Sequence, residues 1–162
     1  KACALGEADL KDVLAGLLPT LGYNGSVTTF LDYWFRKDSA FNPDVLNIVR
    51  QLNQIDGVEL YLATNQEHHR AGYLWEELGL KELFKDNFYS ARLGFHKDSI
   101  NFFTKINTRL DIGQIEKPLF FDDAEKNVTT AREAGWDAYF FDTADALFQN
   151  PRLRDVLGDR IV

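Results

Sequence analysis

The sequence predicts an α/β protein in which helices cover both faces of a parallel sheet. Two observations lead to this prediction. The chain contains short apolar runs with turn residues on either side, and such runs indicate buried strands. These runs are 58–63, 118–121 and 138–141. Segments with apolar residues at helical spacing alternate with them, and these are 66–78, 97–108 and 125–134. Strands and helices that alternate in this way favour right-handed βαβ units and therefore a parallel sheet.

The first part of the chain, up to about residue 54, predicts helices alone. Leucines recur at helical spacing within 10–18. Ser26 has the position of an N-cap for a second helix, and Asn42-Pro43 combines a cap with a proline at the first helical position. A short strand at 87–90 completes the expected elements.

The composition and charge of the chain disfavour several classes of function. The chain has 162 residues, a formal net charge of −7 and a sequence pI near 4.9, which disfavours a nucleic-acid groove. It contains no apolar stretch near the roughly 18 residues of a membrane span, so we expect no membrane partner. Cys3 is the one cysteine, and the chain has no Cys/His cluster of zinc-binding spacing. We therefore expect a cytoplasmic protein.

Polar residues that could carry chemistry follow the predicted strands. Thr64 and Asn65 come after the first strand, and Asp122 and Asp123 come after the strand at 118–121. Lys97 lies in the first turn of the predicted helix between them, where a lysine opposes the positive end of the helix dipole. Ligands bind beyond the carboxyl ends of strands in open parallel sheets, so we expect these side chains to converge there.

Each of these residues also has an ordinary structural interpretation. Thr64-Asn65 could cap the next helix, and Lys97 could be a solvated surface lysine. Adjacent carboxylates at Asp122-Asp123 could be a cap, or could bind Mg²⁺, which would relieve their mutual repulsion. We do not expect a joint metal site at His68-His69, since neighbouring residues on a helix diverge. Taken together, the hydroxyl, amide, lysine and carboxylates suit a phosphoryl group with a bridging Mg²⁺.

Three segments in order resemble the second, third and fourth motifs of the haloacid dehalogenase (HAD) superfamily of aspartyl phosphatases. They are Tyr61–Gln66, Gly94–Lys97 and Leu119–Val128, with 131–135 closing the last helix. The resemblance covers roughly residues 6–150. It is strongest to the branch of sugar phosphatases with a small helical cap, including α-glucose-1-phosphate phosphatases. It implies a three-layer Rossmann-like core over 42–162, with 1–41 as the remaining part of the cap.

The resemblance also implies roles for individual residues. Thr64 would hydrogen-bond the transferring phosphoryl group, Asn65 would shape its pocket, and Lys97 would balance its charge. Asp123 would bind Mg²⁺ directly and Asp122 would bind it through water. Asn127 would support their loop. The implied function is a Mg²⁺-dependent hydrolase of a small phosphorylated metabolite, of sugar type, through a phospho-aspartyl intermediate.

The sequence departs from this family at one decisive motif. Asp-x-Asp-x-Thr, which supplies the nucleophile, does not occur in these residues. We expect it upstream of Lys1, on a central strand between the strands ending at Ala63 and Phe121. Those two strands should then not pair with each other, and residues 1–162 alone should be inactive. Two alternatives stay open, a metal-free haloacid-type dehalogenase and a non-catalytic HAD-like binding domain.

Overall fold

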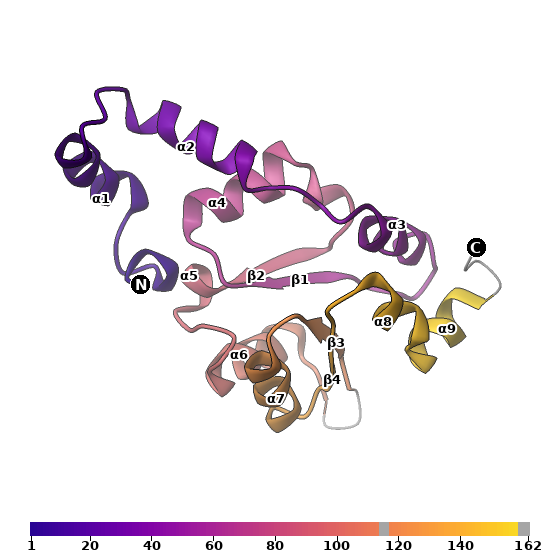
Figure 1. Ribbon diagram of the computed structural model, residues 1–162. Helices are drawn as coiled ribbons and strands as arrows, with labels where there is room; N and C mark the ends of the chain where they lie inside the picture. The colour runs from indigo at the N-terminus through magenta and orange to yellow at the C-terminus, as the bar shows by residue number, and fades with distance from the viewer. Residues whose placement is uncertain (114–116, 159–162) are drawn as a thin grey trace.

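The computed structural model describes residues 1–113 and 117–158, and their strands form two parallel pairs (Figure 1). β1 (Tyr61–Thr64) pairs with β2 (Asp86–Tyr89), in a register that sets Tyr61 opposite Asp86. β3 (Leu119–Asp122) pairs with β4 (Asp137–Phe140), with Leu119 opposite Asp137. Helices connect the strands within each pair, so the predicted α/β class with parallel strands is confirmed.

β1 and β3 do not pair with each other in the described part of the chain. This agrees with the expectation that another strand belongs between them. Each of the two therefore has one edge whose backbone groups make no ladder hydrogen bonds within 1–113 and 117–158. A two-stranded sheet is only marginally stable alone, so such edges favour the addition of a further strand.

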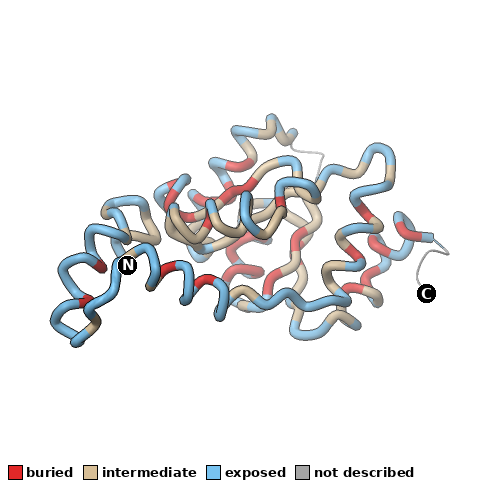
Figure 2. The backbone as a smooth tube through the Cα atoms, turned by 90° about the horizontal axis from the view of Figure 1, so that it is seen from above, coloured by how far each residue is buried: buried red, intermediate tan, exposed pale blue. Residues whose placement is uncertain are grey.

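Two helices at the amino end pack on one another and leave their outer faces exposed (Figure 2). α1 (Leu10–Leu17) begins at the N-cap Asp9, and α2 (Val27–Lys37) begins at Ser26, whose hydroxyl accepts from the Thr29 amide at 3.0 Å. Short 3₁₀ turns, η1 (Cys3–Leu5) and η2 (Leu18–Leu21), flank α1. The buried members of this cluster are Leu14, Leu18, Leu31 and Phe35. The division into a cap over 1–41 and a core over 42–162 stays a prediction.

A second cluster joins α3 (Pro43–Leu52) to two helices at the carboxyl end. These are α8 (Ala144–Gln149) and α9 (Pro151–Leu157), which the sequence analysis did not predict. Ile48 and Leu52 of α3 pack there with leucines of α8 and α9. The cap at Asn42 is confirmed, because its Oδ1 accepts from the Asp44 amide at 3.0 Å.

The main core lies between the strands and the helices that connect them. It contains Phe88 of β2, Phe120 of β3, and Phe102 and Phe103 of α6, the last two fully buried. The connecting helices are α4 (His68–Gly72), α5 (Ser90–Leu93), α6 (Ile100–Leu110) and α7 (Glu125–Glu133). α4 continues as a π-helical turn, η3 (Tyr73–Glu77), which is followed by the 3₁₀ turn η4 (Leu80–Glu82). Within 1–113 and 117–158, no helix has both the length and the apolar character needed to cross a bilayer.

An ion pair fixes the start of α9 against β4. Arg152 Nη1 donates to Asp137 Oδ2 at 2.7 Å and to the Lys117 carbonyl at 3.1 Å. The hydrogen bond from the Arg152 guanidinium lowers the pKa of Asp137, and burial opposes this only in part. Both side chains are partly exposed, so the pair is a modest contribution to stability.

We expect Asp137→Asn to lower the free energy of unfolding at pH 7 by less than about 1 kcal/mol. Because the folded-state pKa of Asp137 is below its unfolded value, the contribution is fully present above about pH 4 and is lost as the pH falls through the folded value. Urea denaturation of both proteins at pH 7 and under acid conditions measures this. If the difference in the free energy of unfolding between the two proteins grows as the pH falls, the ion pair is not the source of the lowered pKa of Asp137.

Candidate active site

Lys97 joins the carboxyl ends of β1 and β3, although it belongs to neither strand. Its backbone amide donates to Oδ1 of Asn65, just beyond β1, at 2.9 Å. Its ammonium group donates to Oδ2 of Asp122, the last residue of β3, at 2.5 Å. One residue in the loop before α6 therefore holds together the ends of two strands that do not pair.

The Asp122 carboxylate is buried and both of its oxygens have partners. Only 3% of its side chain is exposed, against 12% for Lys97. Oδ1 accepts from Asn127 Nδ2 at 2.8 Å and from the Ala124 amide at 3.0 Å. Burial of a charged group is costly unless it is paired and hydrogen-bonded, and here the ammonium group, side-chain amide and backbone N–H meet that need.

Asp123 and Thr64 lie next to this network in the chain, and no hydrogen bond among the described residues joins their side chains to it. Asp123 follows Asp122 directly and its side chain is exposed. Thr64 ends β1, next to Asn65, and is half-buried. The structure thus brings together Asn65, Lys97, Asp122 and Asn127 by hydrogen bonds, and places the other two at the same strand ends by chain position.

The expected position of Lys97 in the first turn of a helix is wrong. α6 begins at Ile100 with Ser99 as N-cap, so Lys97 precedes the helix and does not lie in its first turn. The argument from the helix dipole therefore does not apply. Lys97 is also not a solvated surface lysine, because its ammonium group is paired with a buried carboxylate.

The side chains of this site that could bind a metal are the carboxylates of Asp122, the last residue of β3, and Asp123, which follows it. Among the described residues, no group of three or more His, Cys, Asp or Glu side chains is arranged to hold a metal ion. Mg²⁺ is commonly held by one or two carboxylates, with water and substrate phosphate as the remaining ligands. Asp122 and Asp123 fit that donor set. His68 and His69 diverge as expected, since His68 Nδ1 lies 3.2 Å from the Tyr89 hydroxyl and His69 Nε2 lies 3.0 Å from Asp9 Oδ2.

Sequence reasoning missed two supports of the site. Ser90 is fully buried just after β2, and its hydroxyl donates to the Gln66 carbonyl at 3.1 Å, which fixes the loop after β1. A polar residue at the end of an apolar strand, as in Asn87-Phe88-Tyr89-Ser90, is the signal that could have identified it. Lys126 and Asp98 form an exposed ion pair at 2.8 Å, which links the loop carrying Lys97 to α7.

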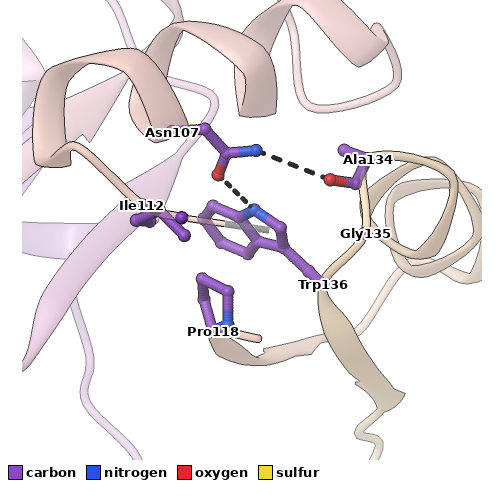
Figure 3. A pocket seen from close by; sticks show the side chains of 7 residues that line it. Asn107, Ile112, Pro118, Ala134, Gly135 and Trp136 are labelled. Carbon is purple, nitrogen blue, oxygen red and sulfur yellow. Dashed lines mark hydrogen bonds between the residues drawn. The ribbon is translucent and has the colours of Figure 1, made fainter. Parts of the chain in front are cut away.

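A separate pocket lies at the opposite, amino ends of β3 and β4 (Figure 3). Pro118 and Trp136, which precede these strands, line it together with Asn107 of α6. The polar groups here satisfy one another. The Trp136 indole donates to Asn107 Oδ1 at 2.7 Å, and Asn107 Nδ2 donates to the Ala134 carbonyl at 3.5 Å. This pocket is therefore a structural feature, away from the strand ends where the polar network lies.

Comparison with known proteins identifies the fold. No protein-family model and no curated protein matches the chain. Solved structures of HAD family enzymes do match it. One from Bacteroides thetaiotaomicron is 17% identical with a TM-score of 0.75, over 92% of this chain and 76% of that chain. The same enzyme in complex with magnesium and inorganic phosphate matches over 87% of this chain and 73% of that chain, at 17% identity and a TM-score of 0.74.

A further match is a protein from Porphyromonas gingivalis described as a predicted HAD-like family hydrolase. It is 18% identical, with a TM-score of 0.70, over 87% of this chain and 70% of that chain. At these identities the likeness shows a shared fold. The chain therefore has the HAD-like α/β fold that the resemblance implied.

The ion pair of Lys97 and Asp122 makes a testable contribution to stability. Loss of one partner of a buried pair leaves an uncompensated charge, which costs about 3–5 kcal/mol. We expect Lys97→Met to lower the free energy of unfolding by that amount, and Lys97→Met combined with Asp122→Asn to recover most of it. Denaturant unfolding of the single and double variants forms the required cycle.

Lys126→Met is the matched control, because Lys126 has the same side chain in an exposed pair. This substitution should lower the free energy of unfolding by less than about 1 kcal/mol. Equal losses for Lys97→Met and Lys126→Met would show that the Lys97 pair is not buried in solution.

Proposed function

We propose that the protein is a Mg²⁺-dependent phosphomonoester hydrolase that acts on a small phosphorylated metabolite of sugar type. The observation that carries this proposal is the Lys97–Asp122 pair at the adjoining ends of β1 and β3. The pair lies at the carboxyl ends of these two strands, where the chain also places Asp123, Thr64 and Asn65. Preorganised charges and donors of this kind stabilise a transferring phosphoryl group. The HAD-like fold, and a structural neighbour solved with magnesium and inorganic phosphate, support the same chemistry.

We assign the two carboxylates different roles. Asp123 is exposed and is free to bind the metal directly, whereas the partners of both Asp122 oxygens favour an indirect role through water. Asn127 holds Asp122 in place, and Lys97 balances the negative charge of phosphate and carboxylates. Bound Mg²⁺ would supply charge neutralisation at the phosphoryl oxygens.

The nucleophile in this proposal is an aspartate upstream of Lys1, carried by a strand between β1 and β3. The unpaired edges of these two strands support such an insertion. That aspartate would attack phosphorus, release the alcohol and form a phospho-aspartyl intermediate. Water would then cleave the intermediate to inorganic phosphate. We further propose a cytoplasmic location, for which the lone cysteine gives compositional support.

Asp123→Ala in the full-length protein tests the metal assignment. We expect it to abolish Mg²⁺-dependent release of phosphate from a generic aryl phosphate, since a direct ligand is lost. Asp122→Ala should act less directly on metal affinity and more on stability, because it leaves Lys97 unpaired. Steady-state rates over a Mg²⁺ titration, with melting curves for each variant, separate the two effects.

Glu133→Ala is the matched control, because Glu133 is an exposed carboxylate at the far end of α7. Full Mg²⁺-dependent turnover in Asp123→Ala would overturn the assignment. Turnover of a haloacid without Mg²⁺ would indicate the dehalogenase, and no turnover of either substrate by the full-length protein would indicate a binding domain.

The position of the nucleophile has its own test. Residues 1–162, expressed alone and supplied with Mg²⁺ and an aryl phosphate, should show no turnover. Activity that co-purifies with this polypeptide would place the nucleophile within residues 1–162 and would contradict the proposed strand.

A further inference from the structure

The two amino-terminal helices, α1 and α2, share few apolar contacts with the core. Their buried cluster is formed by their own residues, and among the described residues the core contributes Tyr73 of the π-helical turn to it. The rings of Phe35 and Tyr73 lie 5.4 Å apart, centroid to centroid. Segments with few buried apolar contacts open at a lower free energy than the core does. We therefore expect polar contacts at this junction to set how firmly the two helices are held.

Two consecutive residues at the start of α4 make these polar contacts. His69 holds the start of α1, because its Nε2 lies 3.1 and 3.0 Å from the two carboxylate oxygens of Asp9. Arg70 holds the end of α2, where Nη1 lies 3.2 Å from Asp38 Oδ2 and Nη2 donates to the Asp38 carbonyl at 2.5 Å. Asp9 is also the N-cap of α1, and its Oδ1 accepts from the Lys11 amide at 2.7 Å. Each amino-terminal helix is thus tied to α4 by one basic side chain.

The two contacts respond differently to pH. The Arg70 side chain stays charged throughout, is 11% exposed, and its guanidinium carbon lies 5.2 Å from the centre of the Phe35 ring. His69 is 26% exposed, and a histidine changes its charge between about pH 5 and pH 8. The hydrogen bond from His69 lowers the pKa of Asp9, and the hydrogen bond from the Lys11 amide lowers it further. Asp9 therefore stays ionised over the range in which a histidine titrates.

The other charged groups bonded at this junction are already engaged. Asp9 faces the His69 ring from the start of α1. At the end of α2, Asp38 is paired with Arg70. On α4 itself, Glu67 is the N-cap, and its carboxylate accepts from the His69 backbone amide at 2.8 Å. The protonation state of the His69 ring is therefore the variable that distinguishes a charged junction from a neutral one.

The chain before α1 is anchored on its other side. Gly6 has φ +74°, and a Cβ there would overlap the carbonyl oxygen of Ala91 in α5. The position therefore requires glycine, and the backbone lies directly on α5. Glu7 and Ala8 alone separate this anchor from Asp9. Release of Asp9 would free α1 to move while the chain stays fixed at Gly6.

We propose that the His69–Asp9 pair is a pH-sensitive contact that holds the amino-terminal helices against the core. It is an ion pair while His69 is protonated, and a weaker neutral hydrogen bond once His69 loses its proton. The helices are therefore held most firmly on the acid side of the histidine titration, and the contact weakens as the pH rises through that titration. Because Arg70 stays charged, the change falls mainly on α1. This contact acts on conformation and does not depend on the proposed hydrolase activity.

Hydrogen exchange of the full-length protein tests this proposal. Exchange is read by mass spectrometry at about pH 5 and about pH 8, and is corrected for the intrinsic pH dependence of exchange. We expect the protection of the α1 amides to be about two- to fivefold lower at the higher pH. The amides of α6, whose Phe102 and Phe103 are fully buried, are the internal reference and should not change. Arg70→Met should lower protection in α2 by the same factor at both pH values.

Two substitutions remove the charge of the pair and keep its hydrogen-bonding groups. Asp9→Asn retains a good N-cap residue, and His69→Gln retains a side-chain donor. Either variant should show α1 protection that does not change with pH. His68→Gln is the matched control, because His68 is the neighbouring histidine and its Nδ1 lies 3.2 Å from the Tyr89 hydroxyl. It should keep the pH dependence of the unaltered protein.

Equal protection of α1 at the two pH values in the unaltered protein would overturn the proposal. So would a parallel change in α6, which would show a global loss of stability, or an unaltered pH dependence in Asp9→Asn or His69→Gln. Loss of the pH dependence in His68→Gln would also overturn it, because the responsible group would then be His68.

Discussion

The buried ion pair between Lys97 and Asp122 is the constraint on which the arrangement of the site depends. β1 and β3 belong to separate strand pairs in the described residues, so no backbone ladder aligns their carboxyl ends. Lys97 does so instead, through its amide to Asn65 and its ammonium group to Asp122. A buried pair contributes little net stability against an apolar substitute, but its geometry is specific, because either charge alone is costly. Such an arrangement is consistent with a role in function and not only in packing.

The rest of the fold buries the apolar faces of the strands and helices. Phe88 of β2 and Phe120 of β3 bury their rings in one cluster with α6 and α7, which ties the two strand pairs into one core although their strands do not pair. The opposite face of β3 packs against α3, α8 and α9 through a second cluster, which contains Leu119 and Phe121. Helices therefore cover both faces, and the free edges of β1 and β3 are what the core leaves open. The strand that we propose as the carrier of the nucleophile would lie between these two edges.

Elements set by local chemistry could be predicted, and those set by tertiary contacts could not. The strands were predictable because their apolar runs are short and bounded by turns, and α3 because Asn42-Pro43 is a clear helix start. Asn150-Pro151 carries the same signal and opens α9. The π-helical turn at 73–77 could not be predicted, because the spacing of apolar residues there is that of an ordinary α-helix. The Lys97–Asp122 pair joins residues 25 positions apart, so only the fold could show that the predicted site residues meet.

The most direct test of the account is to trap the covalent intermediate in the full-length protein. The protein is mixed with Mg²⁺ and an aryl phosphate, quenched in acid, and digested for peptide mass spectrometry. We expect a phosphorylated aspartate outside residues 1–162, and we expect it to be absent when Asp123 is replaced by alanine. A phosphorylated residue within 1–162, or turnover with no covalent phosphate on the protein, would contradict it.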